Sequence, residues 1–379
     1  MTEICVLSFK PLANDPRIYR QVKWLSPDYD VYTLGPADTA IQGITCVDMG
    51  YRPQNNFLKA LRGASLLTGR HETFYWLAPH IKHSWRRLQQ LKPPIIVANE
   101  LECWPLAVKA KAMWNCKIIL DAHEFYPGMY SEDLKWRVLF GKFTRTMCQQ
   151  TLAHADGITT VSETLCDYYE RDFGRRPTLI TNAPFYKELT TSQTQNDRIR
   201  IIHHGHLMPS RSPEIFIEAM KHVKQNVELT FMFKVDPSQK KYEQAFRQQA
   251  AQDSRIHFRD PVPMTEIPKT INQYDVGIHL LPPVNPNHQG ALPNKFFEFI
   301  QARLAVLFSP NPEVSRMIKT HELGIVSQGF SARELGEAIN MLTPEKIRAC
   351  KENAHKASQI LCAENNEKRF RELIQAVLT

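Results

Sequence analysis

The sequence predicts an α/β protein made of two doubly wound domains, each a parallel sheet with helices on both faces. Short, almost uniformly apolar segments alternate with longer amphipathic ones, which is typical of parallel strands buried between helices. The alternation stops once, in the polar stretch at residues 186–198, and then starts again. With 379 residues, the chain is long enough for two domains that each have a core of their own.

The first half begins with an apolar strand at residues 3–9 and a helix from about residue 15 to 24, which has its apolar residues on one face. Another helix is expected after Ser162, because a serine hydroxyl accepts hydrogen bonds from the free N–H groups of a helix start. Apolar segments predict further strands at residues 30–35, 44–49, 93–100, 116–124, 156–161 and 177–184. Apolar periodicity predicts the other helices at residues 103–115 and 133–155.

The second half repeats this alternation. Apolar segments predict strands at residues 198–207, 227–233, 255–258, 275–281, 304–308 and 323–327. Amphipathic segments predict helices at residues 238–251, 264–272, 293–302, 331–342, 344–356 and 360–378. The polar stretch at residues 186–198 separates the two series, so it is the expected linker.

Composition and charge narrow the class of protein. Hydrophobic residues make up 43% and charged residues 23%, which is typical of a globular chain. No run of about 18 apolar residues predicts a membrane span, and the first residues lack a signal-peptide pattern, so we expect a cytoplasmic protein. The net charge of +8 indicates an anionic partner: a phosphorylated substrate, an acidic lipid surface or a nucleic acid. Eight scattered cysteines without a Cys-x-x-Cys pair favour free thiols over disulfides or zinc ligands.

Ligands of open parallel sheets bind at the carboxyl ends of the strands, so the segments after the strands are the candidate site. Gly205 ends a predicted strand, His206 follows, and Arg211 precedes a helix. Glycine lets a ligand approach the backbone, and a helix N-terminus with a guanidinium group binds anions. This loop therefore suggests an anion site, although a plain loop with a solvated arginine fits the pattern equally.

The segment "PPVNPNHQGALPNKFFEF" at residues 282–299 leads into a helix introduced by Pro293. The helix N-terminus favours a phosphate, Lys295 adds a positive charge, and Glu298 offers a carboxylate to hydroxyl groups. A sugar nucleotide needs this combination, since positive groups bind its diphosphate and a carboxylate binds its ribose diol. Lys295 and Glu298 also share a helix face, so a surface pair is the alternative.

Two further segments carry polar residues near strand ends. His123 and Glu124 follow a predicted strand in "DAHEFYPGMY", where a histidine is either structural or catalytic. Asp28 and Asp30 form an Asp-x-Asp pattern, which can bind metal. They lie in a turn before a strand without other carboxylates nearby in the sequence, so we interpret them as turn residues and predict no metal site.

The segment at residues 55–92 concentrates basic and aromatic residues. One interpretation is a pair of helices whose apolar face lies in the core. The other is a basic, aromatic surface that faces an anionic membrane. Nucleic-acid binding would need clustered basic and aromatic residues on one face, whereas positive charge is dispersed along this chain, so we expect no nucleic-acid partner.

Several segments, in the same order, resemble the motifs of family 4 glycosyltransferases, which are retaining enzymes of the GT-B type. "NDPRIYRQVKWL" resembles the family's Asp-Pro-Arg-Val helix, and "VANELECWPLAVKAK" with "KIILDAHEFYP" resembles the segment that carries its histidine. "ADGITTVSETLCDYY" and "TNAPF" are similar to the end of its first domain. "GHLMPSRSPEIFIEAM" resembles the first loop of the donor domain, and "YDVGIHLLPP" with "LPNKFFEFIQARLAVLF" resembles its donor loop.

The resemblance covers nearly the whole chain and implies a GT-B fold, with two Rossmann-like domains facing across a cleft. It implies an acceptor-binding domain at residues 1–186, a nucleotide-sugar domain at residues 198–360, and a final helix at residues 361–379 that packs back on the first domain. It also implies retaining, metal-independent transfer of a sugar from a nucleoside-diphosphate sugar, without a cofactor. The expected acceptor is a saccharide or lipid-linked molecule of the cell envelope. Peripheral attachment to the inner face of the membrane is an alternative to a purely cytoplasmic location.

Carried over residue by residue, the resemblance places His123 near the reacting carbon, Arg211 on the diphosphate and Glu298 on the ribose. The expected catalytic residues are His123, Arg211 and Lys295. The expected donor-binding residues are Gly205, His206, Arg211, Pro263, Gly290, Ala291, Leu292, Asn294, Lys295 and Glu298. The expected acceptor-side residues are Lys10, Asp15, Arg17, Glu100 and Glu124.

The chain departs from the family's pattern in its loops. Gly290 stands where the family has the first glutamate of a Glu-x7-Glu motif, so a side-chain contact to the sugar is missing. His206 stands where many members have arginine, and it is positive only when protonated. The N-terminal loop lacks a glycine pair common in the family. Two alternatives stay open: a sugar-nucleotide 2-epimerase of the same architecture, and a catalytically weak donor-binding scaffold in a glycan-assembly complex.

Overall fold

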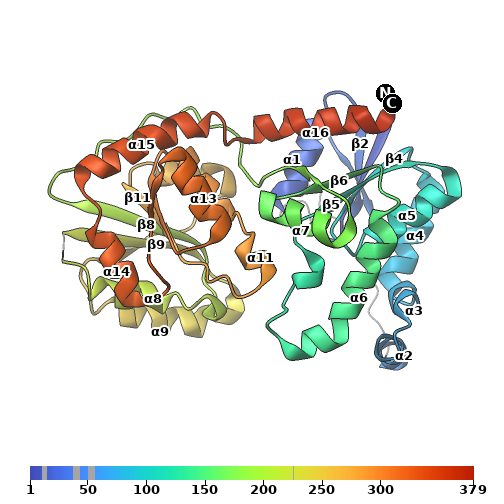
Figure 1. Ribbon diagram of the computed structural model, residues 1–379, viewed down its shortest axis with the longest axis horizontal. Coiled ribbons are helices and arrows are strands. Elements are labelled where there is room, and N and C mark those ends of the chain that lie inside the picture. The colour runs from blue at the N-terminus through green and yellow to red at the C-terminus, as the bar shows by residue number, and fades with distance from the viewer. Residues whose placement is uncertain (11–14, 37–42, 50–55, 225) are drawn as a thin grey trace. The chain divides into compact units, whose positions relative to one another are not determined.

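The computed structural model of the chain describes residues 1–10, 15–36, 43–49, 56–224 and 226–379. The chain forms two compact units. The first unit comprises Met1–Thr181, Val284–Asn287 and Asn366–Thr379, and the second comprises Asn182–Pro283 and His288–Asn365. Each unit is a parallel sheet flanked by helices (Figure 1).

The sheet of the first unit has the strand order β3-β2-β1-β4-β5-β6-β7, and all neighbours run parallel. The strands are β1 (Glu3–Leu7), β2 (Asp30–Gly35), β3 (Thr45–Asp48), β4 (Ile95–Asn99), β5 (Lys117–Ala122), β6 (Gly157–Thr160) and β7 (Thr178–Leu179). The order reverses at β1, which pairs with β2 on one side and β4 on the other. Such a reversal marks the place where ligands of open sheets bind.

The helices of the first unit cover both faces of this sheet. They are α1 (Pro16–Leu25), α2 (Asn56–Leu67), α3 (His71–Trp76), α4 (Pro79–Leu91), α5 (Trp104–Trp114), η2 (Tyr126–Gly128), α6 (Leu134–Leu152), α7 (Glu163–Phe173) and most of α16 (Ala363–Leu378). Successive strand side chains point to opposite faces. Ile118 and Leu120 of β5 join a core cluster with residues of α4, α5, α6 and α7, whereas Ile119 points to the other face.

The C-terminal helix α16 packs on that other face (Figure 1). Its Leu373 lies with Ile119 against Gly157. Phe370 packs against Trp24 of α1, with ring centroids 5.8 Å apart. Arg371 pairs with Asp28. One carboxylate of the Asp-x-Asp pattern therefore has a structural partner.

The sheet of the second unit has the order β10-β9-β8-β11-β12-β13, again parallel throughout. The strands are β8 (Ile199–His206), β9 (Val227–Lys234), β10 (Ile256–Phe258), β11 (Val276–His279), β12 (Ala305–Phe308) and β13 (Gly324–Val326). The helices are η3 (Pro209–Arg211), α8 (Glu214–Met220), η4 (Pro237–Gln239), α9 (Lys240–Ala250), η5 (Met264–Glu266), α10 (Ile267–Ile271), α12 (Asn294–Gln301), α13 (Pro312–His321), α14 (Ala332–Asn340) and α15 (Pro344–Ser358), with α11 (Pro286–Gln289) at the boundary of the two units.

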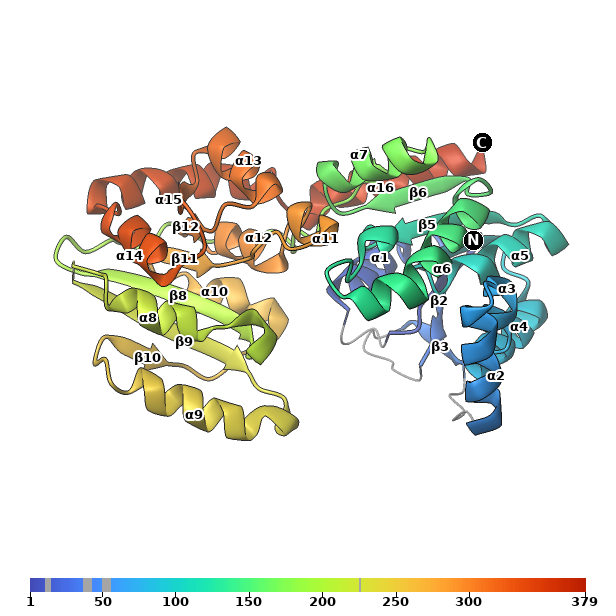
Figure 2. The ribbon, with the colours of Figure 1, turned by 60° about the horizontal axis from the view of Figure 1, so that its bottom comes forward.

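Two apolar clusters hold this second sheet between its helices. Phe231 and Phe246 belong to the cluster that includes residues of α8, α9 and α14. Phe296 and Phe308 belong to the cluster that includes residues of α10, α12 and α13. Figure 2 shows α8 and α9 on one side of the sheet and α12 and α13 on the other. Both faces are therefore buried, which explains the uniformly apolar strands of the sequence.

A few elements differ from the prediction. The predicted helix pair at residues 55–92 is a series of three helices, α2, α3 and α4, and residue 55 lies outside the described residues. The predicted helix at residues 264–272 is the short turn η5 followed by α10. The loop before α12 contains the short helix α11, which we did not predict. Within the part of the chain that the structure describes, no helix is both long and apolar enough to span a bilayer.

Candidate functional site

Gly205 and Lys295 lie together in the second unit. Gly205 is near the end of β8 and has a φ of +127°, a conformation that favours glycine. The Lys295 side chain lies over it, because a β-carbon at residue 205 would be 2.6 Å from Lys295 Cε and 2.7 Å from Nζ. The glycine therefore leaves the space in which the ammonium group lies, close to the carboxyl end of the strand.

Lys295 stands in the first turn of α12, after Pro293 in an extended conformation. Burial and the positive charge of Arg211 lower the pKa of Lys295 to about 8, although the charge of Glu298 opposes this shift. Arg211 is exposed at the end of η3, the turn that follows β8. Two positive side chains thus repel each other at one strand end, and no ion pair of either is found among the described residues. An anion would remove this repulsion.

Three buried histidines lie near Lys295, and the sequence analysis did not identify them. His203 and His204 come from β8, and His279 comes from β11. His203 Nδ1 is 2.8 Å from the carbonyl oxygen of Ile278, and its ring stacks on His279 with centroids 5.6 Å apart. Burial and the charge of Lys295 lower the pKa of His203 to about 3 and hold those of His204 and His279 well below their usual value. These rings are therefore neutral at physiological pH. The available signal was a histidine pair within an apolar strand, directly before Gly205.

Glu298 is a buried carboxylate in the second turn of α12, with 8% of its surface exposed. Its Oε2 atom is 3.5 Å from Nε2 of the neutral His204. The burial excludes the alternative in which Lys295 and Glu298 form a solvent-exposed pair. The second unit therefore brings Gly205, Arg211, Lys295 and Glu298 together around one strand end.

The other predicted donor residues lie in varied surroundings. His206 is at the end of β8, where partial burial and the charge of Lys234 lower its pKa, so it adds no positive charge at neutral pH. Leu292 is a core residue in the same apolar cluster as Phe296. The remaining ones are Pro263 and Asn294, which are exposed, Ala291, which is half-buried, and Gly290, which is buried.

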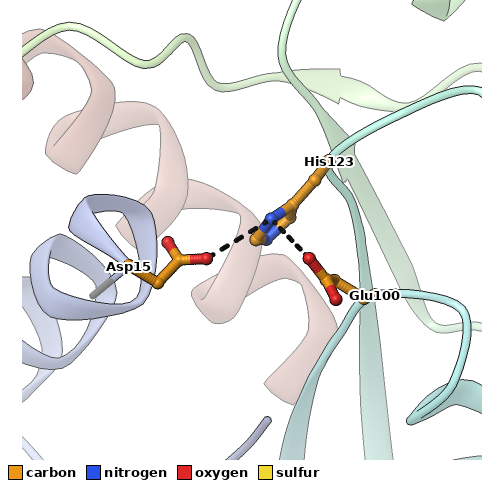
Figure 3. Close-up of side chains that lie close together, drawn as sticks. All are labelled: Asp15, Glu100 and His123. Atoms are coloured by element: carbon orange, nitrogen blue, oxygen red, sulfur yellow. Dashed lines mark ion pairs between the residues drawn. The ribbon is translucent and has the colours of Figure 1, made fainter. Parts of the chain in front are cut away.

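Asp15, Glu100 and His123 form a group in the first unit (Figure 3). Glu100 follows β4, His123 follows β5, and Asp15 precedes α1. His123 Nδ1 is 3.8 Å from Asp15 Oδ2 and 3.5 Å from Glu100 Oε1. The ammonium group of Lys10 pairs with Glu100 and lies 4.0 Å from Asp15 Oδ2. The fold thus brings the predicted catalytic histidine together with three predicted acceptor-side residues.

This group also has the residue types of a metal site. One ligand atom from each of Asp15, Glu100 and His123 lies within 4.8 Å of the other two. However, the ammonium group of Lys10 already lies beside both carboxylates. Burial lowers the pKa of Lys10, but the hydrogen bond and charge of Glu100, with the charge of Asp15, raise it overall. Lys10 is therefore protonated, and a metal ion would have to displace it.

The buried carboxylate of Asp121 lies beside His123 in the interior of the first unit. Its carboxylate accepts hydrogen bonds from Arg17 (2.7 and 2.6 Å), Gln21 (2.5 Å) and Thr159 (2.5 Å). Its Oδ2 atom is 3.2 Å from His123 Nε2. Burial would raise the pKa of Asp121, but the charges of Arg17 and His123 hold it well below its usual range. We expected Arg17 to face the acceptor. It is instead buried against Asp121, because its guanidinium group neutralises a carboxylate in the core.

Glu124 follows His123 directly, and its charge is among those that raise the pKa of Lys10. Its backbone carbonyl accepts a hydrogen bond from the Tyr169 hydroxyl at 2.7 Å. Its side chain is 3.5 Å from Asn287 Nδ2. Asn287 also accepts a hydrogen bond from the Phe125 N–H at 2.6 Å, so it fixes the loop after β5. Sequence reasoning did not identify this asparagine.

Residues 28–184 match the family model described as Glycosyltransferase Family 4. Over these residues the chain is similar to family 4 glycosyltransferases. The match confirms the resemblance for the sequence motifs that lie within these residues. Among curated proteins, none matches the chain.

Solved structures of glycosyltransferases and a synthase share the fold of the whole chain. HepE from Anabaena, in complex with UDP and glucose, is 14% identical with a TM-score of 0.73, and the match covers 99% of this chain and 100% of HepE. Sucrose-phosphate synthase from Thermosynechococcus elongatus is 14% identical with a TM-score of 0.74, covering 100% and 99%. WaaG, a glycosyltransferase involved in lipopolysaccharide biosynthesis, is 13% identical with a TM-score of 0.67, covering 99% of both chains. These similarities confirm the predicted GT-B fold with two Rossmann-like domains.

Proposed function

We propose that the chain is a retaining glycosyltransferase that transfers a sugar from a nucleoside-diphosphate sugar to a saccharide or lipid-linked acceptor. The observation that carries this proposal is the Lys295 ammonium group over Gly205, with Arg211 near it and with Lys295 itself in the first turn of α12. Two cations and a helix N-terminus together favour a diphosphate. The solved structures of Anabaena HepE contain UDP or UDP-glucose, which supports a donor of this class.

The donor-side residues have separate tasks in this proposal. Negative charge builds up on the diphosphate as the bond to the sugar breaks, and stabilising that charge lowers the barrier. Lys295, whose pKa is about 8, is mostly protonated at neutral pH, and Arg211 carries its charge at any physiological pH. Glu298 accepts hydrogen bonds from the ribose hydroxyls. Backbone N–H groups near Gly290 replace the side-chain contact that the family's first glutamate makes to the sugar.

On the acceptor side, His123 is the residue that we place beside the reacting carbon. Asp121 and Asn99 each lie 3.2 Å from its Nε2 atom, so the ring has a fixed orientation. In a front-face reaction the acceptor hydroxyl attacks from the side that the diphosphate leaves, and the leaving phosphate takes its proton. Such a reaction keeps the anomeric configuration and needs no carboxylate nucleophile.

We further propose that turnover is independent of metal ions. Lys295 and Arg211 supply the positive charge near Gly205, and Lys10 supplies it beside Asp15 and Glu100. The proposal includes an acceptor domain at residues 1–186, a donor domain at residues 198–360 and a final helix at residues 361–379. It also includes a membrane-facing surface on α4, where Lys82, Arg86 and Arg87 are exposed.

A panel of UDP-, GDP- and ADP-sugars in a thermal-shift assay tests donor binding, since a ligand that binds the folded state raises its melting temperature. We expect one nucleotide to stabilise the protein, and Lys295→Ala to remove that effect. Hydrolysis or transfer is then followed with and without EDTA. Equal rates support the metal-independent mechanism, whereas loss of activity that Mg²⁺ or Mn²⁺ restores contradicts it.

The same assay separates the alternatives. Binding of a nucleotide sugar without hydrolysis or transfer would favour the donor-binding scaffold. Conversion of the donor sugar to its 2-epimer, detected by NMR of the products, would favour the epimerase. A sugar product with the donor's anomeric configuration supports the retaining transferase, and inversion would overturn that part of the proposal.

A further inference from the structure

A cavity of about 330 Å³ lies in the first unit, between α2, α3 and α6 and the loops that follow β4 and β5. Aromatic side chains form much of its wall. Phe74 packs edge-on against Phe143 with centroids 5.0 Å apart, and Trp136 and Phe140 continue this wall along α6 at 6.3 Å. The size and the apolar, aromatic lining are typical of small-molecule sites.

The charged residues around this cavity are neutralised within the protein. Glu100 pairs with the ammonium group of Lys10, and Glu102 Oε1 is 2.7 Å from His80 Nε2. The guanidinium group of Arg62 lies 4.5 Å above the Phe74 ring, and its Nε donates a hydrogen bond to the Phe74 carbonyl at 3.1 Å. The negative charge of Glu102 acts on this guanidinium group and balances its positive charge. The cavity therefore has no surplus charge to attract a phosphate or a carboxylate.

Tyr126 also lines the cavity, three residues after His123. Its hydroxyl is buried and has no hydrogen-bond partner among the described residues. Burial, with the charge of Glu100, holds the pKa of Tyr126 well above its usual value, so the hydroxyl is neutral. A buried hydroxyl without a partner costs stability, and an uncharged ligand with an oxygen atom could satisfy it.

We propose that this cavity binds the apolar aglycone of an uncharged acceptor, such as an alkyl or aryl glycoside. Glu100 belongs both to the wall of the cavity and to the group of Asp15, Glu100 and His123. A ligand whose apolar part fills the cavity therefore has its polar end beside the predicted acceptor-side residues. The role of this ligand as an acceptor rests on the proposed function, whereas its binding does not. The cavity thus selects acceptors by the apolar group that is attached to their sugar.

Calorimetry of the full chain with methyl, hexyl and octyl β-glucoside, below micelle-forming concentrations and without donor, tests the proposal. We expect affinity to rise at least about tenfold from methyl to octyl glucoside, because each buried methylene contributes favourably. Octyl sulfate is the anionic probe and is expected to bind more weakly than octyl glucoside. Equal affinity for methyl and octyl glucoside, or stronger binding of octyl sulfate, would overturn the proposal.

Two variants locate the binding. Trp136→Ala is expected to weaken octyl glucoside binding at least about fivefold, since it removes part of the wall. Trp85→Ala is the matched control: this tryptophan is also half-buried in the first unit but lies outside the cavity, stacked on Trp114. Tyr126→Phe keeps the shape, so the free protein should be as stable as the wild type or more stable, while binding falls about threefold to tenfold. Wild-type affinity in both Trp136→Ala and Tyr126→Phe would contradict the location.

The donor assay distinguishes the two possible failures. If octyl glucoside binds in the cavity but no nucleotide sugar stabilises the protein, the proposed function fails and the cavity remains a binding site. If a nucleotide sugar binds and is hydrolysed but octyl glucoside does not bind, the proposed function stands and this inference fails.

Discussion

The ammonium group of Lys295 lies directly against the backbone of Gly205, where a β-carbon would be 2.7 Å from its nitrogen atom. We therefore expect Gly205→Ala to displace the lysine and to weaken nucleotide-sugar binding about tenfold or more. Part of the loss comes from backbone strain, because φ is +127° at this residue and a side chain there costs roughly 1–3 kcal/mol. Titration calorimetry with the preferred nucleotide sugar measures the effect.

Gly174→Ala is the control for that strain. Gly174 has a φ of +66° at the end of α7, and a β-carbon there would meet no atom within 4 Å. This variant should lose stability but keep its donor affinity.

A double variant tests whether Gly205 and Lys295 act together. If Lys295→Ala alone and Lys295→Ala combined with Gly205→Ala bind the donor equally weakly, the two residues act together. Additive losses would contradict this coupling.

Donor affinity should depend on pH through Lys295. Its pKa is lowered to about 8, and a bound diphosphate raises it again, so binding above pH 8 requires the uptake of a proton. Affinity is therefore expected to be constant below about pH 7 and to fall as the pH rises through 8, by at most tenfold per pH unit. Lys295→Arg should remove this dependence, because arginine keeps its charge. A flat profile in the wild type would contradict the assignment of Lys295.

Glu298→Gln should weaken donor binding by roughly 1–3 kcal/mol, because charge-assisted hydrogen bonds from the ribose hydroxyls are lost. The same nucleotide with a 2′-deoxyribose sharpens the test. Wild type should prefer the ribonucleotide, whereas Glu298→Gln should bind both forms with similar affinity. An unchanged preference in a folded variant would show that Glu298 does not contact the ribose.

Asp121→Asn should destabilise the protein by about 3–5 kcal/mol, because Arg17 is left as an unpaired buried charge. The pKa of Asp121 is depressed in the folded state. Its contribution is thus present above the unfolded pKa of about 4 and is lost as the pH falls further. Denaturant unfolding at pH 7 and at pH 3.5 measures both effects. The wild type should lose more stability between these values than the variant does.

The basic surface of α4 predicts binding to anionic vesicles. Lys82, Arg86 and Arg87 are exposed, and each contributes about 1 kcal/mol near such a membrane. Replacing all three by serine should abolish co-sedimentation at low salt without changing donor binding. We leave Arg62 intact, because its Nε bonds the Phe74 carbonyl.

The matched control for the vesicle experiment replaces Lys240, Lys241 and Lys269, which are exposed in the second unit, by serine. It removes the same total charge from another surface and should leave vesicle binding intact. Binding should also fall steeply with salt, since the Debye length is only about 8 Å at physiological ionic strength. If the wild-type chain stays in the supernatant at low salt, α4 is an ordinary solvated helix.

Most of the fold could be predicted because the central strands of both sheets are buried on both faces and are therefore almost uniformly apolar. The predicted helix at residues 293–302 is α12 (Asn294–Gln301), and the predicted strand at residues 275–281 contains β11 (Val276–His279). The helix α11 could not be predicted, because four residues are too few to show a helical period.

Candidate site residues could be predicted only where the strand topology alone determines their position. Parallel strands end at one edge, so Gly205 and His123 were natural candidates. The place of Arg17 could not be predicted, because its partner Asp121 is 104 residues away. The neutral state of His203 and His279 likewise depends on burial between strands that are distant in sequence. Sequence reasoning identified the residues that follow strands. It missed the buried residues that contact them from the interior of each unit.

The first unit is assembled from three separate stretches of chain, and residues 366–379 are the last of them. Phe370 and Leu373 of this stretch cover Trp24 and Gly157, so a large apolar face stays open while the second unit is being synthesised. The emerging protein therefore has to protect that face from aggregation until α16 leaves the ribosome. Truncation before residue 366 should yield an insoluble product even though every β-strand is present.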